Sequence, residues 1–541
     1  MTAVPDRSLS ESYWAADDNV PLSDHTVGSL LADRARTHPS AVALIGTPHS
    51  SAVPERLTYS DLYREALRVA AALAEITEPG EFVALWAPNA VEWPIIQFGA
   101  ALAGRVLVAL NPAFRESELV YTLEHSGATV LIHADGYRGY DMAAVAGTAV
   151  ERVPGVRRLI SLSDAVLWES SRSNYEPAEI DPDDPVMLQY TSGTTGNPKG
   201  VLLRHRSLVN VAKMTMAAAE IAEGSVFVNP LPMFHTAACV IGTLGPVWMA
   251  GTILLIETFV PETVLRLAAE ENADVLFFVP TILGALLEIT RGKEDAAPRF
   301  TSIVGGAANV PQVMIEGAAR VFGASVHNLF GQTELAPVIT ATRRNDSLAD
   351  QLSTVGHPIP QVEVKIAGTD GAGVAPLGVP GEICARGYQQ MIEYYRDPAS
   401  TAAAVDAEGW LHTGDLGSMD SRGYVTVTGR LKDLIISGGE NIAPAEVESR
   451  LLEHAAIQQA AVVGVPHEKW GETVAAVLVV RGDQPDDLVD SVKAQLSTTL
   501  SPFKTPRRWF VADSLPATPS GKVQKFLLRQ AIVDGVVDEI G

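Results

Sequence analysis

The stretch YTSGTTGNPKGV, residues 190–201, alternates hydroxyl side chains with glycines and carries almost no side-chain bulk. Residues 186–188 (VML) lead into it as a predicted strand and VLLRH follows directly, so a short flexible linker is disfavoured. Such a loop presents backbone N–H groups and hydroxyls to a polyanion, because no side chain holds a phosphate away. Its order differs from the G-x-x-x-x-G-K-S/T loop of P-loop NTPases, since Gly200 follows Lys199. The stretch predicts a phosphate loop of another kind.

Helical periodicity and short β-branched runs alternate along most of the chain. Residues 62–76 predict a helix and residues 81–87 a strand, and the same order returns at residues 264–273 and 274–280. Strands that alternate with helices indicate parallel, doubly wound α/β layers. After about Val362 short strands and turns dominate, which predicts a smaller β-rich subdomain.

The length of the chain, 541 residues, exceeds what one hydrophobic core usually serves, so at least two domains are expected. The β-rich texture ends near residue 429, and Pro444 then occupies a first helical turn, a position that suits proline. We therefore expect a large N-terminal domain over residues 1–429, a hinge at residues 430–432, and a small α+β C-terminal domain over residues 433–541.

The charge and the cysteine content indicate which partners and which cellular compartment to expect for this protein. The chain has 40 basic and 64 acidic residues, a formal net charge of −24, which repels nucleic acid and acidic membrane surfaces. Two cysteines, Cys239 and Cys384, do not make a disulfide framework; both lie in apolar sequence and are expected to be buried. The N-terminus has no secretory pattern, so a reducing, cytoplasmic location is expected.

One apolar stretch is long enough to span a bilayer. Residues 226–256 contain no Asp, Glu, Lys or Arg. Three prolines and three glycines divide the stretch, and His235 lies inside it, which favours a strand–loop–helix–strand passage through a core. We expect a pocket wall and no transmembrane segment.

The stretch HNLFGQTE, residues 327–334, follows a predicted strand, and ligand sites of α/β sheets gather at strand ends. Phe330 could face an adenine, Thr333 could bond a phosphate, and Glu334 could hold Mg²⁺. Taken alone, the octapeptide could also be a solvated loop.

Gly305, Gly306 and Ala307 follow another predicted strand, residues 302–304. Small residues at this position let a flat ligand approach the backbone. An ordinary strand-to-turn glycine pair is a fair alternative.

Three more motifs lie downstream: GWLHTGDLG (409–417), GRLKDLIISGGENI (429–442) and LPATPSGKVQK (515–525). Together with residues 190–201 and 327–334, they make five separated motifs spread over nearly the whole chain. These motifs, in this order, resemble those of the adenylate-forming (ANL) superfamily, in its acyl-CoA synthetase branch. That branch includes fatty-acid and aryl-acid CoA ligases. The family usually has tyrosine where this chain has Phe330, so the aromatic face is kept and a hydroxyl is lost. The resemblance implies a large adenylation domain with doubly wound sheets and a β-rich subdomain, plus a small mobile C-terminal domain.

The resemblance also implies an ATP site and its metal. Asp415 resembles the carboxylate that grips the ribose hydroxyls, Arg430 a nucleotide-contacting arginine, and Glu334 with Thr191 the Mg²⁺ ligands. The residues carried over to ATP binding are Thr191, Ser192, Gly193, Thr194, Thr195, Gly196, Lys199, Gly306, Ala307, Asn328, Phe330, Gly331, Gln332, Thr333, Asp415 and Arg430.

Catalytic and acceptor residues follow from the same resemblance. Lys522 resembles the catalytic lysine that neutralises charge at the α-phosphate, whereas Lys525, three residues on, is interpreted as a solvated surface lysine. Lys432 falls at the hinge. Gly438, Gly439 and Glu440 fall on the backbone edge that lines the pantetheine tunnel, and the remaining catalytic candidates are His235, Glu334 and Thr191.

His235 lies in the segment PLPMFHT and has two interpretations. A lone histidine in an apolar run is most often a core residue, whereas the family's Phe-His pair guards the carboxylate entrance as a gate. The acyl-pocket candidates are mostly small or apolar, and a long alkyl chain or a flat aryl acid would suit them: His235, Thr236, Val279, Thr281, Leu335, Ala336 and Val338.

The activity implied is a two-step ligation. A carboxylic acid and ATP give an acyl-adenylate and pyrophosphate, and coenzyme A then displaces AMP to form a thioester. Transfer to an amine or to a carrier protein in trans is the alternative; a luciferase-like oxidase and a non-catalytic nucleotide-binding module are further, less supported ones. The implied cofactors are ATP, Mg²⁺ and coenzyme A, and a homodimer is compatible with the resemblance.

Overall fold

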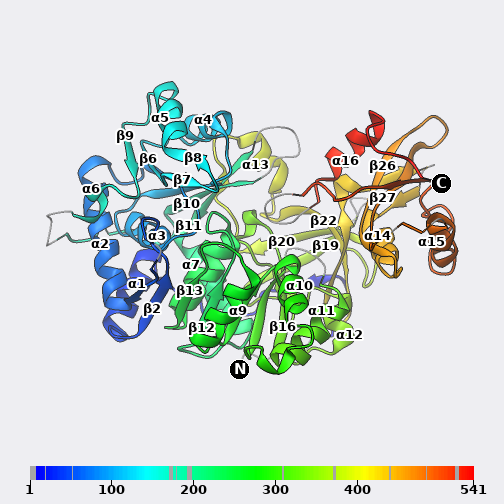
Figure 1. The fold of residues 1–541 in the computed structure, drawn as a ribbon, viewed down its shortest axis with the longest axis horizontal. Coiled ribbons are helices and arrows are strands. Elements are labelled where there is room, and N and C mark those ends of the chain that lie inside the picture. Colours follow the sequence, from blue (N-terminus) through cyan, green and yellow to red (C-terminus); the bar gives the residue numbers. More distant parts are fainter. Residues whose placement is uncertain are drawn as a thin grey trace. The chain divides into compact units, whose positions relative to one another are not determined.

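A computed structural model describes residues 8–18, 20–51, 53–169, 175–177, 179–191, 198–306, 310–368, 373–437, 440–482, 484–485, 487–517 and 523–540 (Figure 1). The chain divides into two compact units. The first comprises Met1–Asp6, Trp14–Val364 and Ala385–Leu411, and the second comprises Arg7–Tyr13, Lys365–Cys384 and His412–Gly541.

A seven-stranded sheet forms one layer of the first unit. Its order is β21 (Glu393–Tyr394), β11 (Lys199–Arg204), β10 (Pro185–Thr191), β5 (Val106–Leu110), β4 (Phe82–Trp86), β6 (Val130–His133) and β9 (Arg158–Ser161). The strands from β10 to β9 are parallel, whereas β11 is antiparallel to both of its neighbours. Helices α3 (Glu92–Leu102), α4 (Glu116–Ser126) and α5 (Met142–Arg152) connect strands of this sheet, and α2 (Tyr59–Ile76) packs on α3 (Figure 1).

A nine-stranded sheet forms the other layer of the first unit. Its order is β18 (His357–Pro358), β17 (Thr340–Ala341), β16 (Ser325–Phe330), β15 (Ser302–Gly306), β14 (Val275–Phe278), β12 (Val226–Asn229), β13 (Thr252–Leu255), β2 (Val42–Gly46) and β3 (Glu55–Thr58). The six strands from β16 to β2 are parallel. The connecting helices include α9 (Pro261–Glu270) and α10 (Pro280–Ile289). Alternating strands and parallel pairing confirm the doubly wound prediction.

Local sequence explains why α2 begins and what it buries. The Thr58 side chain accepts the Asp61 N–H, and the Asp61 carboxylate accepts the Thr58 N–H, which forms a capping box at the helix start. Apolar side chains then recur at helical spacing and are buried. The predicted helix at residues 62–76 is confirmed and is extended by this cap.

The apolar stretch 226–256 folds as predicted. It runs from β12 through η1 (Ala237–Ile241) and α8 (Gly242–Trp248) into β13, and most of its side chains are buried. Across the described ranges, no helix combines the length and apolar character that crossing a bilayer requires.

The second unit contains most of a five-stranded sheet, ordered β1 (Tyr13–Trp14), β19 (Val362–Ala367), β20 (Gly381–Gly387), β22 (Leu411–Met419) and β23 (Val425–Arg430). A second sheet joins β25 (Glu440–Ile442), β24 (Ile435–Ser437), β27 (Gly471–Val480), β26 (Ile457–His467) and β28 (Arg508–Val511). Helices α14 (Pro444–Leu452), α15 (Leu488–Ser497) and α16 (Lys525–Val533) belong to the same unit (Figure 1).

Proline opens α14 as predicted, at a position where its missing N–H costs nothing. A π-helical turn, η3 (Ala318–Phe322), precedes β16 in the first unit. The second compact unit includes the β-rich residues 365–384 and 412–430 as well as the C-terminal region. The hinge at residues 430–432 stays a prediction.

Helices α2 and α3 pack so closely that a glycine separates them. A Cβ added at Gly99 would lie 2.6 Å from Val69 Cγ1 and 2.9 Å from the Ala66 carbonyl oxygen, whereas a Cβ at Gly147 of α5 would meet nothing within 4 Å. We expect Gly99→Ala to destabilise the first unit by about 1–3 kcal/mol through overpacking. Gly147→Ala, its matched control, should stabilise by up to about 1 kcal/mol. Thermal scans at one heating rate measure both shifts, and equal signs would contradict this packing account.

Candidate active site

The base of the predicted phosphate loop is an antiparallel strand pair. β10 ends at Thr191 and β11 begins at Lys199, and these two residues are direct partners in the ladder. Residues 192–197, which carry Ser192, Gly193, Thr194, Thr195 and Gly196, lie outside the described residues. The paired strands therefore fix where the loop leaves the sheet and where it returns.

Two tyrosines tie this base to α4. The Tyr121 hydroxyl donates to the Pro198 carbonyl at 3.1 Å, and the Tyr190 hydroxyl donates to the Thr122 carbonyl at 3.0 Å. The His125 imidazole contacts the Tyr190 hydroxyl at 2.9 Å. Burial raises the pKa of Tyr190 well above its ordinary value, so its hydroxyl remains a donor. The loop base is thus held by neutral hydrogen bonds.

Tyr394 contacts both Glu334 and Lys199. Glu334 lies in η4 (Thr333–Leu335) with 9% of its surface exposed, and its Oε1 accepts a hydrogen bond from the Tyr394 hydroxyl at 2.7 Å. The Lys199 ammonium lies 4.7 Å from the centroid of the Tyr394 ring. Sequence reasoning missed Tyr394, which is 60 residues from Glu334 along the chain. Only its aromatic neighbour in YYRDPAST marks the segment, and that pattern carries no chemistry by itself.

Glu334 and Thr191 carry the kinds of oxygen atom that bind Mg²⁺ in proteins. Mg²⁺ prefers carboxylate, hydroxyl and phosphate oxygens, and Glu334 and Thr191 supply the first two kinds. Among the described residues Tyr394 is the one side chain that hydrogen-bonds the Glu334 carboxylate, and the bond uses Oε1. Oε2 is therefore available as a ligand.

Close backbone approach explains the glycines at the ends of β15 and β16. A Cβ on Gly306 would lie 2.2 Å from the Leu329 carbonyl oxygen, and one on Gly331 would lie 2.0 Å from the Pro337 carbonyl oxygen. The Asn328 N–H donates to the Thr342 hydroxyl at 2.8 Å, which fixes the end of β16. Ala307 lies outside the described residues. The remaining predicted ATP contacts of this unit, Phe330, Gln332 and Thr333, are half-buried.

The acyl-pocket candidates differ in burial. Thr236, Leu335, Ala336 and Val338 are buried, whereas Val279 is half-buried and Thr281 is exposed. His235 is half-buried, and its ring lies 4.9 Å from that of Phe234, centroid to centroid. Cys239, in the same stretch, is buried as predicted, and burial raises the pKa of its thiol.

In the second unit, Asp415 and Arg430 face each other across two strands. They are direct partners of β22 and β23, and the Arg430 Nε lies 2.9 Å from the Asp415 Oδ1. Asp415 is 5% exposed. The turn before Asp415 is fixed by Glu382, whose carboxylate accepts the Gly414 N–H at 3.0 Å and pairs with the His412 ring at 2.7 Å. A buried carboxylate on a fixed turn is a rigid acceptor.

Cys384 completes a Glu382–His412 cluster in which the three potential metal-ligating atoms lie within 4.8 Å of one another. The thiol is buried as predicted, with Sγ 3.5 Å from the His412 Nδ1. Since the Glu382 carboxylate already bonds both His412 and the turn, the cluster is accounted for as hydrogen bonding that holds β22 to β20.

The acceptor and catalytic residues of the second unit are only partly described. Lys432 follows Arg430, and burial, with the Arg430 charge second, lowers its pKa. Gly438, Gly439, Lys522 and the Glu440 side chain lie outside the described residues. Lys525 opens α16 and pairs with Glu448 at 2.8 Å, so this lysine, interpreted as merely solvated, is an ion-pair partner instead.

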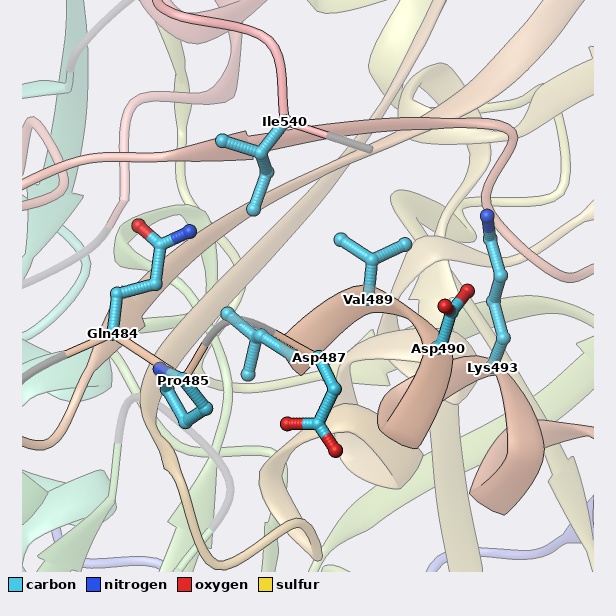
Figure 2. Close-up of a pocket in the computed structure, with 8 residues that line it drawn as sticks. Gln484, Pro485, Asp487, Val489, Asp490, Lys493 and Ile540 are labelled. Atoms are coloured by element: carbon cyan, nitrogen blue, oxygen red, sulfur yellow. The ribbon is translucent and has the colours of Figure 1, made fainter.

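A hollow of about 290 Å³ in the second unit contains none of the predicted site residues. Figure 2 shows its wall, from the start of α15 to the C-terminal segment: Gln484, Pro485, Asp487, Leu488, Val489, Asp490, Lys493 and Ile540. Its lining mixes two acids, one base and aliphatic groups, without a convergent set of donors.

Comparison with known proteins identifies the family of the chain. Residues 31–395 match the family model described as AMP-binding enzyme, and residues 446–522 match the AMP-binding enzyme C-terminal domain. The fold and the site define an adenylate-forming enzyme of the ANL type. The chain belongs to the AMP-binding enzyme family.

The similar proteins are named as ligases. The chain is 35% identical to 3-[(3aS,4S,7aS)-7a-methyl-1,5-dioxo-octahydro-1H-inden-4-yl]propanoyl:CoA ligase of Rhodococcus jostii, over 88% of this chain and 94% of that protein. It is 30% identical to the mitochondrial medium-chain acyl-CoA ligase ACSF2 of Rattus norvegicus, over 96% of this chain and 89% of that protein. ATP-bound MatB from Rhodopseudomonas palustris has the same fold, with a TM-score of 0.84, 27% identity and coverage of 94% and 99%. The chain is an AMP-forming acid–thiol ligase.

Proposed function

We propose that this ligase activates an apolar carboxylic acid with ATP and passes the acyl group to coenzyme A, through the residues assigned below. The observation that carries the proposal is the meeting of Lys199 and Glu334 at Tyr394, beside the base of the phosphate loop. The Lys199 ammonium can bind a triphosphate while the Glu334 carboxylate binds the metal ion that accompanies it. The relatives named CoA ligases favour coenzyme A over an amine or a carrier protein as acceptor.

In the first step, the acid carboxylate attacks the α-phosphorus of ATP and pyrophosphate leaves. Carboxylate is a poor electrophile, and adenylation supplies the leaving group. The loop residues 191–196 and Lys199 bind phosphate oxygens in this proposal, and Phe330 stacks on adenine between Gly306 and Asn328. Lys522 stabilises the negative charge that develops at phosphorus.

Glu334 and Thr191 are the proposed Mg²⁺ ligands. When bound, the ion neutralises charge on the triphosphate oxygens. Asp415 accepts hydrogen bonds from the two ribose hydroxyls, for which its two oxygens are matched. Arg430 orients that carboxylate and contacts the nucleotide.

In the second step, the coenzyme A thiolate displaces AMP from the acyl-adenylate. Gly438, Gly439 and Glu440 line the path of the pantetheine arm, where side chains would obstruct a thin thiol. We place the hinge at Lys432, between a large domain of residues 1–429 and a small domain of residues 433–541. Rotation about it would present Lys522 in one step and the thiol path in the other.

The acid is proposed to be a medium-length alkyl or a compact ring acid. The buried Thr236, Leu335, Ala336 and Val338 are small or apolar, and the similar ligases are named for a medium chain and for a bicyclic propanoyl group. His235 is proposed as a gate at the carboxylate entrance. A role in fatty acid metabolism, a cytoplasmic location and a homodimer remain parts of the proposal; the rat relative is named mitochondrial.

The acceptor and the acid are tested together in a pyrophosphate-release assay. Medium-chain and ring acids are each supplied with ATP and with coenzyme A or an amine. We expect a thioester product when coenzyme A is the acceptor and no amide product when an amine is the acceptor. An amide product formed faster than the thioester would contradict the proposal.

Lys522→Ala should abolish adenylate formation and spare thioester formation from supplied acyl-adenylate. Loss of one donor that stabilises the transition state costs on the order of a hundredfold or more. The matched control is Lys525→Ala, three residues away, which loses only the pair with Glu448 and should retain both half-reactions. Equal loss of both half-reactions in Lys522→Ala would refute the assignment.

Asp415→Ala should remove the enzyme's preference for ATP over 2′-deoxyATP. The carboxylate is proposed to bond both ribose hydroxyls, and a hydrogen bond to a charged group contributes about 1.5–3 kcal/mol. The measurement is kcat/KM for pyrophosphate release with each nucleotide. A variant that loses activity and still discriminates between the two nucleotides would assign Asp415 to holding the β22 turn instead.

Gly439→Leu should leave ATP–pyrophosphate exchange nearly intact and block thioester release. The added bulk is expected to obstruct the thiol path and not the adenylation chemistry. The two rates are measured on one preparation. An exchange rate as damaged as the overall rate would show that this glycine serves folding.

A further inference from the structure

Three elements of the first unit meet at one tyrosine. Tyr394 is the last residue of β21, Lys199 is the first of β11, and Glu334 lies in η4. The Tyr394 hydroxyl donates to Glu334 at 2.7 Å, and its ring lies 4.7 Å from the Lys199 ammonium. The hydroxyl of Tyr394 thus contacts the Glu334 carboxylate, and the face of its ring lies near the Lys199 ammonium.

Backbone pairing holds Tyr394 rigidly in this position. β21 is antiparallel to β11, with Val201 opposite Tyr394. The Tyr395 N–H donates to the Gly200 carbonyl, and the Tyr394 N–H donates to the Thr401 hydroxyl at 3.0 Å. The Met391 N–H donates to the Glu334 carbonyl at 2.8 Å, so the segment also holds the backbone of the residue whose carboxylate it orients.

The Tyr394 hydroxyl is a donor to this carboxylate, since a carboxylate oxygen can only accept at 2.7 Å. A neutral phenol donating to one carboxylate oxygen fixes the rotation of the group. The other oxygen then points in a set direction. A cation near an aromatic face is attracted to the ring quadrupole, which restrains the long lysine side chain in turn.

We propose that Tyr394 is a positioning residue with two separable roles: its hydroxyl orients Glu334 for a divalent cation, and its ring orients Lys199 for the nucleotide phosphates. This inference rests on the proposed roles of Glu334 and Lys199. It adds a residue that touches neither the acid nor the reacting phosphorus and acts through two that bind the nucleotide.

The experiment separates the two roles by direct binding. Mn²⁺ binding is measured by electron paramagnetic resonance with α,β-methylene-ATP present, and binding of the same analogue is measured in EDTA. Tyr394→Phe keeps the ring and should weaken Mn²⁺ binding about tenfold, since a hydrogen bond to a charged group is lost. Its metal-free nucleotide affinity should be unchanged. Tyr394→Leu should also weaken metal-free nucleotide binding, about threefold, because the ring is gone.

Controls distinguish this inference from the function on which it rests. Tyr395→Phe removes the hydroxyl of the neighbouring tyrosine, whose ring lies 4.9 Å from that of Phe82, centroid to centroid. This variant should bind Mn²⁺ and nucleotide as the wild type does. Glu334→Gln should weaken Mn²⁺ binding at least as much as Tyr394→Phe. If Glu334→Gln binds Mn²⁺ normally, the metal assignment of Glu334 is wrong. If only Glu334→Gln is affected and Tyr394→Phe binds normally, the inference about Tyr394 is overturned and the metal assignment stands. The thermal midpoint of each variant identifies a general loss of folding.

Discussion

Strand β11 exchanges backbone hydrogen bonds with β10 on one side and β21 on the other, and the first-unit site depends on both pairings. The pairing with β10 sets Thr191 opposite Lys199, so the loop between them begins and ends at one place on the sheet. The pairing with β21 brings in Tyr394, and through it the Glu334 carboxylate. A one-residue slip in either register would turn these side chains to the other face.

The parallel strands of the nine-stranded sheet contribute in a different way. Ligand sites in open α/β sheets gather at the carboxyl ends of strands, and β15 and β16 end at Gly306 and Phe330. Adjacent parallel strands that end together leave little space, because backbone carbonyls lie where a Cβ at Gly306 would stand. This close approach of the Leu329 backbone accounts for the glycine at position 306.

Local sequence was enough to predict the helix at residues 62–76 and the doubly wound character of the layers, because hydrophobic periodicity acts over a few residues. Asp415 and Arg430 were assigned from two separate motifs, and the structure brings them together because β22 and β23 pair as antiparallel strands. Tyr394 could not be predicted in this way. Its contact with Glu334 joins residues that are 60 positions apart in the chain, which a local sequence pattern does not specify. The interpretation of Lys525 as a solvated lysine was wrong for the same reason, because its partner Glu448 lies on another helix.

Overall charge and local charge act at different ranges in this protein. A net charge of −24 opposes the approach of large polyanions, yet the assigned substrates, ATP and coenzyme A, are themselves anions. Screening at physiological ionic strength confines the general field to about 8 Å, so contacts made inside the site decide binding. In the proposed function Lys199 binds the nucleotide phosphates, and in the second unit Arg430 pairs with Asp415 at 2.9 Å, which keeps its charge next to that carboxylate. Single cations placed on strands are therefore compatible with an acidic chain that uses small anionic substrates.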